Sequence, residues 1–137
     1  MASESEFVDV WLCRFPSKQH ADSYFEETYG DDDEMRPISP FAADMGQLFY
    51  DHDVMERGAF YDPPISDVSA AIAPHSYSTS YLAEVNAAFR SKPFVPFNFV
   101  LLFWDQEIEH PASIAKPEHV LHYLGRFKST RPAKPTA

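Results

Sequence analysis

The stretch FNFVLLFW, at residues 97–104, is the one from which we expect the fold to be organised. The run is apolar at nearly every position, which predicts a strand that is buried on both faces, as strands inside a sheet are. Residues 7–15, FVDVWLCRF, also carry apolar side chains on both faces. We therefore expect residues 97–104 to form a central strand and residues 7–15 to lie inside the same sheet.

Two further strands are expected beside these. Residues 120–128 alternate between an apolar face and a polar face. The apolar face would hold Leu121, Tyr123 and Phe127, and the polar face His122 and Arg126. Residues 47–55 fit a strand about as well as a helix, and we favour the strand. Residues 106–118 contain Pro111 and Pro117 and predict a connecting loop.

The expected helices begin at serines, whose hydroxyls accept hydrogen bonds from free backbone N–H groups. These N-caps are Ser17, Ser39, Ser66 and Ser78. The first helix would bury Ala21, Tyr24, Phe25 and Tyr29 and end at Gly30. The second is short, because Pro40 suits a first helical position and Gly46 follows its end. The third would span residues 66–73.

With 137 residues, of which 45% are hydrophobic, the chain fits one domain with its own core. The order of elements predicts an α/β (α+β) fold: a single two-layer domain with a mixed or antiparallel sheet of about four strands and helices packed on it. We expect this domain to span residues 1–128. Residues 129–137 predict a flexible basic tail.

Acidic residues are concentrated in one region. The net charge is −10, and the stretch from Glu26 to Asp62 holds eleven acidic residues against two basic ones. From Arg126 onward the chain holds four basic residues and no acidic one. One side of the fold should therefore carry a negative potential, which repels nucleic acid and anionic membranes and attracts cationic partners.

Several function classes find no support in the sequence. Neither GxGxxG, GxxxxGK[ST] nor GxSxG occurs, and one cysteine, Cys13, provides no zinc motif. The longest apolar run is too short to span a bilayer, and MASESEF has no signal-peptide pattern. His119 and His122 would face opposite sides of a strand, which disfavours joint metal ligation. We expect a cytoplasmic protein without a cofactor or a bound metal.

One cluster of titratable residues leaves two interpretations open. Asp51, His52, Asp53 and Glu56 follow one another closely, and on a strand Asp51 and Asp53 would share a face. The spacing does not match a calcium-binding loop. The cluster is either part of an acidic interaction surface or, as the alternative, the acid, base or metal-ligand set of a small metal- or ligand-binding enzyme.

Six blocks of sequence, taken in their order, resemble a known family. They are VWLCRF, SPFAADMG, YDHDVME, HSYSTSYLAEV, FNFVLLFWDQEI and HYLGRF, which cover roughly residues 8–127. In this order they resemble the immunity protein 22 family of bacterial polymorphic toxin systems. The chain departs from that family at Leu12 and Cys13, where a glycine more often follows the tryptophan of the first strand.

The resemblance implies a small cytoplasmic antidote that binds a cognate toxin domain, blocks it and has no catalytic activity of its own. The acidic charge makes a basic nuclease the expected target, because opposite charges steer association. Contact would centre on exposed aromatic residues ringed by carboxylates. The candidates are Phe49, Tyr50 and Tyr61 with Asp51, Asp53 and Glu56. The acidic loop Asp31, Asp32, Asp33 and Glu34 is a second candidate contact.

Overall fold

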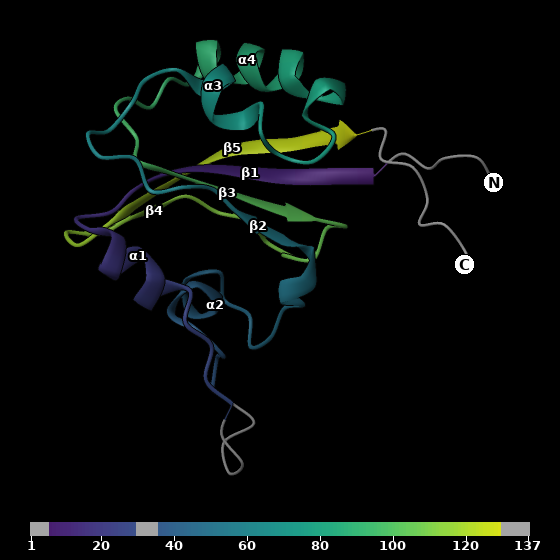
Figure 1. The fold of residues 1–137 in the computed structure, drawn as a ribbon. Helices are drawn as coiled ribbons and strands as arrows, with labels where there is room; N and C mark the ends of the chain where they lie inside the picture. The colour runs from purple at the N-terminus through teal and green to yellow at the C-terminus, as the bar shows by residue number, and fades with distance from the viewer. Residues whose placement is uncertain (1–5, 30–35, 130–137) are drawn as a thin grey trace.

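The computed structural model describes residues 6–29 and 36–129, and one antiparallel sheet forms its centre (Figure 1). The strands are β1 (Glu6–Arg14), β2 (Met55–Arg57), β3 (Phe99–Trp104), β4 (Ile114–Ala115) and β5 (Val120–Ser129). Their order is β2-β3-β1-β5-β4. The α+β class is confirmed, with five strands where about four were expected. β1 takes the central place, with β3 beside it.

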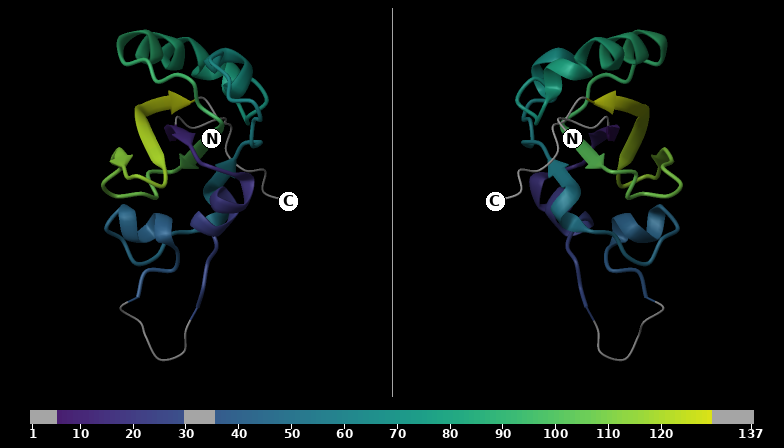
Figure 2. Two further views of the ribbon diagram at one scale, coloured as in Figure 1. Left: turned by 90° about the vertical axis from the view of Figure 1, so that its left-hand side faces the viewer. Right: turned by 90° about the vertical axis from the view of Figure 1, so that its right-hand side faces the viewer.

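Helices cover both faces of the sheet (Figures 1 and 2). They are α1 (Lys18–Tyr24), α2 (Pro40–Asp44), α3 (Val68–Ile72) and α4 (Leu82–Ser91), with the 3-10 turns η1 (His52–Val54) and η2 (Ser78–Ser80). Residues of α1 and α2 pack into a first core, and residues of α3 and α4 into a second core on the opposite face. The structure thus has a helical layer on each face of the sheet, whereas the sequence predicted one sheet layer and one helical layer. Helices pack on both faces because β1 and β3 carry apolar side chains on both sides.

The side chains of β1 alternate between these two cores. Trp11 and Cys13 belong to the first core, and Val10 and Leu12 to the second. Cys13 is fully buried, and burial raises the pKa of its thiol well above its usual value. Across the first core the ring of Phe41 stacks on that of Phe103 with centroids 5.5 Å apart.

A bulge in β5 overturns the predicted arrangement of its side chains. The pairing with β1 shifts between Val10, opposite Gly125, and Trp11, opposite Tyr123, so Leu124 is the extra residue. Gly125 has φ +150, a value that favours glycine. Leu121 and Tyr123 therefore face the first core, whereas Phe127 packs into the second core. A strict two-residue period could not have predicted this switch.

Other boundaries also differ from the sequence prediction. Residues 47–55 do not form a strand as predicted. They run as a loop into η1 at His52–Val54, and the strand that pairs with β3 begins only at Met55. Asp67, not Ser66, caps α3 by accepting a hydrogen bond from Ala70 N. β4 lies within the predicted loop 106–118. None of the helices in the described ranges is long and apolar enough to cross a membrane.

The remaining differences concern helix ends and the last strand. α1 ends at Tyr24, before the predicted end at Gly30, which lies outside the described residues. Ser78 begins η2 instead of capping α4, and α4 begins at Leu82 without a side-chain cap. Ser129, assigned to the tail, is the buried last residue of β5. The rest of the predicted tail, residues 130–137, lies outside the described ranges.

Candidate functional site

Three exposed apolar side chains lie near α2. Their exposed fractions are 63% for Tyr29, 39% for Leu48 and 60% for Phe49. Backbone hydrogen bonds join their segments, from Thr28 N to Ile38 O at 2.8 Å and from Ile38 N to Leu48 O at 3.0 Å. The segments that carry Tyr29 and Phe49 are thereby held together, although 19 residues separate them in the sequence.

α2 begins and ends as the sequence predicted. Ser39 caps it by accepting a hydrogen bond from Ala42 N at 3.1 Å, and Pro40 is the first helical residue. Gly46 follows the helix with φ +71, a left-handed conformation that glycine adopts without steric cost. This reversal directs the chain into the segment that carries Leu48 and Phe49.

Tyr50 is fully buried beneath this segment. Its ring packs edge-on against Phe41 and Phe103, and its hydroxyl lies 3.0 Å from Ser39 Oγ. Burial is the main cause that raises the pKa of Tyr50 to about 12, so the phenol stays neutral at physiological pH. Tyr50 therefore fixes the loop to the core, while its neighbour Phe49 is directed towards solvent.

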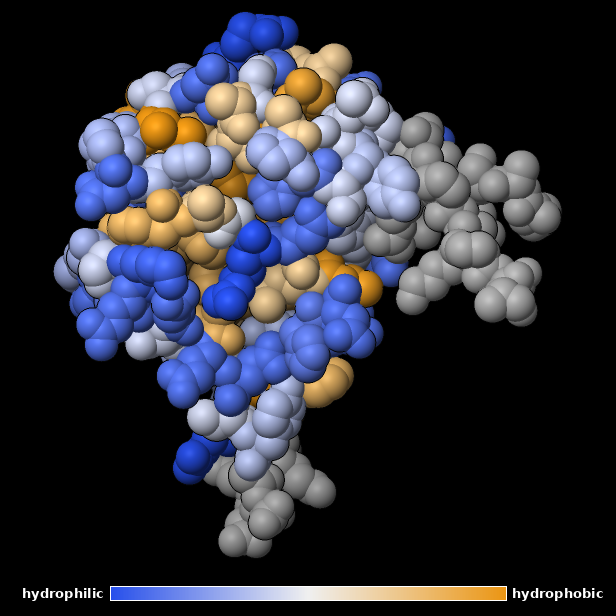
Figure 3. All heavy atoms as spheres, in the orientation of Figure 1, coloured by the Kyte–Doolittle hydropathy of each residue, from blue (hydrophilic) through white to orange (hydrophobic). Residues whose placement is uncertain are grey.

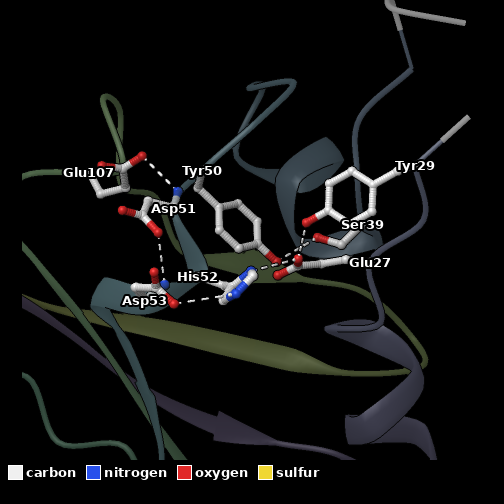
Figure 4. Close-up of polar contacts among 8 residues, drawn as sticks. All are labelled: Glu27, Tyr29, Ser39, Tyr50, Asp51, His52, Asp53 and Glu107. Carbon is white, nitrogen blue, oxygen red and sulfur yellow. Dashed lines mark hydrogen bonds and ion pairs between the residues drawn. The ribbon is translucent and has the colours of Figure 1, made fainter. Parts of the chain in front are cut away.

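Asp51, His52 and Asp53 follow as an exposed turn rather than a strand (Figure 4). Asp51 caps η1, because its Oδ1 accepts a hydrogen bond from Asp53 N at 2.9 Å. Asp51 N donates to the carboxylate of Glu107 at 2.8 Å. The ring of His52 lies between two carboxylates, 3.1 Å from Glu27 Oε1 and 3.4 Å from Asp53 Oδ1.

These residues make up what we call the acidic-aromatic surface. It comprises Tyr29, Leu48, Phe49, Asp51, His52 and Asp53, with the carboxylates of Glu27 and Glu107 beside them. The Tyr29 hydroxyl also donates to Glu27. In the orientation of Figure 1, hydrophilic residues predominate over the lower part of the molecule, with apolar ones among them (Figure 3). The surface combines apolar contact area with negative charge.

Glu56 lies apart from the Asp51 and Asp53 carboxylates. Its Oε1 is 2.9 Å from His75 Nδ1 and accepts a hydrogen bond from Ser76 N, and its Oε2 accepts one from Trp104 Nε1 at 3.1 Å. Burial by itself would raise the pKa of Glu56, but hydrogen bonds from His75 and Ser76 outweigh it and lower the pKa to about 2. These contacts join β2 to β3 and to the segment after α3.

The alternative of a metal- or ligand-binding enzyme gains no support from this geometry. The predicted set Asp51, His52, Asp53 and Glu56 is divided, because Glu56 is held by His75 and Trp104. Within the described ranges, no group of three or more histidine, cysteine, aspartate or glutamate side chains is arranged to hold a metal ion.

Tyr61 lies in a separate cleft of about 860 Å³, lined by residues such as Arg14, Asn98 and His119 and by none of the acidic-aromatic surface. Tyr61 N donates to Asn98 O at 2.9 Å, which fixes its segment beside the sheet. The other predicted contact residues, Asp31, Asp32, Asp33 and Glu34, lie outside the described residues.

A second polar cluster, next to this cleft, joins α1, α2 and the start of β5. His119 Nδ1 lies 3.1 Å from His20 Nε2, and His119 Nε2 lies 3.4 Å from Asp44 Oδ2. Lys116 Nζ donates to Asp44 Oδ1 at 2.6 Å. Burial would raise the pKa of Asp44, but the hydrogen bonds outweigh it and lower the pKa. His122 instead stacks on Phe94 beside the second core, so the two histidines do lie apart, as predicted.

The sequence analysis missed Tyr29, Leu48, Glu27 and Glu107 as members of the surface. Tyr29 was assigned to the buried face of the first helix, but α1 ends at Tyr24 and leaves Tyr29 exposed. The signal that could have revealed this is the pair Glu26 and Glu27 after Phe25, because negative charges near the C-terminal end of a helix are unfavourable. Glu107 is 56 residues from Asp51, so no local pattern could have paired them.

Comparison with known families gives a match over most of the chain. The family model described as immunity protein 22 matches residues 8–129. No match was found among curated proteins, and none among solved structures.

Proposed function

Because the chain belongs to the immunity protein 22 family, we propose that it binds a cognate toxin domain through the acidic-aromatic surface and blocks it. The family supports an antitoxin-type immunity function, which implies a toxin protein as the partner. It also suggests an inhibitor without catalytic activity. We further propose that the protein acts in the cytoplasm.

The observation that carries the choice of surface is the exposure of Phe49 beside carboxylates on a well-anchored loop. Its side chain is 60% exposed, while the adjacent Tyr50 is fully buried. Binding energy in protein complexes is concentrated in a few aromatic or arginine anchors that become desolvated. An anchor on a fixed loop loses little conformational entropy on binding. We assign the anchor role to Phe49, with Tyr29 and Leu48 beside it.

Charge supports a basic partner. Asp51 and Asp53 lie beside Phe49, and Asp31, Asp32, Asp33 and Glu34 follow Tyr29 closely in the sequence. A negative surface accelerates encounter with a positive one and suppresses wrong partners. We propose that the toxin is a basic nuclease whose nucleic-acid cleft this surface covers. We leave Tyr50, Glu56 and Tyr61 out of the proposed contact, because the first is buried and the others lie elsewhere.

Phe49→Ala is expected to weaken binding to the cognate toxin domain by about 30-fold, the effect of losing an anchor worth about 2 kcal/mol. Calorimetric titration of the purified pair measures the dissociation constant. The matched control is Tyr77→Ala, because Tyr77 is 46% exposed and lies beside Trp104 of the second core. If wild type and Phe49→Ala bind with equal affinity and Tyr77→Ala binds more weakly, the toxin contacts the opposite face of the protein.

Asp51→Asn combined with Asp53→Asn is expected to slow association severalfold at low salt and to flatten its salt dependence, because two steering charges are lost. Asparagine at position 51 keeps an oxygen that can accept from Asp53 N, so the turn is retained. Stopped-flow association rates at several salt concentrations measure the effect. Asp67→Asn with Glu84→Gln removes the same charge near the second core and should leave the rates unchanged.

The same measurement tests the neighbouring acidic loop. Reversal of Asp32 and Asp33 to lysine should slow association further and flatten its salt dependence if the loop shares the contact. Unchanged kinetics would limit the contact to the described surface. If neither variant alters the rates, charge steering is not part of the mechanism.

A further inference from the structure

The outer edge of β5 is only partly covered. β4 pairs with β5 at Val120 and Leu121, and Tyr123 N donates to Ser113 Oγ at 2.9 Å. Beyond Tyr123, β5 continues to Ser129. Within residues 6–29 and 36–129, no other strand pairs with that part of β5 except β1, on its inner side.

The hydrogen bonds of β1 show which backbone groups of β5 point outward. Phe7 O accepts from Asp105 N, and Cys13 O accepts from Asn98 N, so the odd-numbered residues of β1 direct their backbone towards β3. The even-numbered residues therefore face β5. Val8 lies opposite Phe127. In an antiparallel pair, such facing residues exchange both hydrogen bonds.

Arg126 and Lys128 flank Phe127, so their backbone N–H and C=O groups point away from β1. Tyr123, on the far side of the bulge, also directs its N–H outward, which agrees with its bond to Ser113. No hydrogen bond from the described part of the chain reaches the outward backbone groups of Arg126 or Lys128. Both residues are exposed. A row of unpaired backbone groups of this kind is a template for another strand.

The charges of the side chains along this edge indicate the chemistry of the partner. Arg126 faces the first core, where it binds Asp9, and Lys128 lies on the same side of the strand by the two-residue period. From Arg126 onward the sequence holds four basic residues and no acidic one. In a symmetric antiparallel pair of two copies, these like charges would lie across from each other, which is destabilising. A second copy is therefore disfavoured, and an acidic segment is favoured.

We propose that the outer edge of β5, at residues 126–128, binds an extended acidic segment of a partner protein by strand addition. Backbone groups of Arg126 and Lys128 would pair with the segment, and Lys128 would contact its acidic side chains. The bulge at Leu124 and the basic side chains prevent the edge from pairing with copies of itself, which leaves it open to a partner of opposite charge. This inference does not depend on the acidic-aromatic surface.

Amide hydrogen exchange followed by NMR tests the edge in the free protein. The amides of Arg126 and Lys128 are expected to exchange much faster than that of Phe127, which is paired with Val8. Slow exchange at Arg126 and Lys128 in dilute protein would show that the edge is already covered and would overturn the proposal. Protection that rises with protein concentration alone would assign the edge to a second copy instead, which also overturns it.

Binding is tested with a capped peptide of about seven residues that alternates glutamate and valine, the length of a typical strand. The peptide is expected to protect the amides of Arg126 and Lys128, whereas a lysine-valine peptide should not. Lys128→Pro is expected to weaken binding about fivefold to tenfold, because it removes one outward donor without breaking the pairing with β1.

Two controls separate the backbone from the charge. Lys128→Glu should weaken binding of the acidic peptide. Lys18→Glu, on the exposed face of α1, should leave the affinity for that peptide unchanged. An acidic peptide that is N-methylated at every residue should not bind if strand addition is the mode, since it has no backbone N–H donors. Equal binding of the methylated and unmethylated peptides, or of the lysine peptide, would refute the proposal. Thermal unfolding of each variant checks that the fold is retained.

Discussion

Replacing Arg126 by alanine is expected to lower the free energy of unfolding by about 3–5 kcal/mol, because it leaves a buried carboxylate without its counter-charge. Asp9 is 0% exposed at the centre of the sheet. Arg126 holds it with two hydrogen bonds, Nε to Oδ1 at 2.9 Å and NH2 to Oδ2 at 3.0 Å. Tyr123 donates a third at 2.5 Å, and this one remains in the variant. Chemical denaturation at neutral pH measures the loss.

Two companion variants isolate the buried charge. Arg126→Lys should restore only part of the stability, since an ammonium group cannot form the bidentate pair. Arg126→Met with Asp9→Leu removes both charges and should be far less destabilised than Arg126→Ala. A loss below about 1 kcal/mol for Arg126→Ala would mean that water satisfies Asp9.

Glu56 is expected to make the folded state sensitive to acid. Its pKa is lowered to about 2, below the usual value of 4.5, because hydrogen bonds from His75 and Ser76 outweigh burial. As the pH falls below 4.5, the unfolded chain takes up a proton that the folded chain does not, so stability decreases towards pH 2. The loss between neutral pH and pH 2 should be on the order of 2–3 kcal/mol, and denaturation midpoints at a series of pH values measure it.

Glu56→Gln is the matched control for this pH dependence. The variant should be less stable than wild type at neutral pH, because the ionised acceptor of three hydrogen bonds is lost. Its stability should change less with pH, so the two curves approach each other near pH 2. Some dependence of stability on pH should remain in this variant, because the pKa of Asp44 is also lowered. Parallel curves for the two proteins would show that Glu56 does not cause the acid sensitivity.

The contacts of Asp9 and Glu56 show that the acidic residues divide into two groups. Asp9 and Glu56 are held by donors inside the fold, and their charge is used for stability. Asp51 and Asp53 remain exposed, so their charge is available to a partner. The proposed contact depends on this second group. Net charge by itself therefore overstates how much of the acidity of the chain can steer a toxin.

Much of the fold followed from local sequence patterns. Residues 7–15 and 97–104 were predicted as interior strands because their apolar residues occupy both faces, and β1 and β3 confirm this. The Ser39, Pro40 and Gly46 signals predicted α2, since caps and left-handed glycines act within one turn. The order of the six blocks identified the family. The exposed carboxylates of Asp51 and Asp53 were also predicted, although as part of a strand.

What the sequence determined by itself was therefore the interior strands, the capped turn, the regional acidity and the family. The strands and the turn depend on neighbours within a few residues, and the acidity and the family follow from the order of residues along the chain. The tertiary structure alone decided which residues are available to a partner. Tyr50 became buried by packing on Phe103, and Glu56 was drawn to Trp104, 48 residues away. The bulge at Leu124 moved Phe127 to the opposite face of the sheet. These outcomes depend on contacts between distant segments, which no local period encodes.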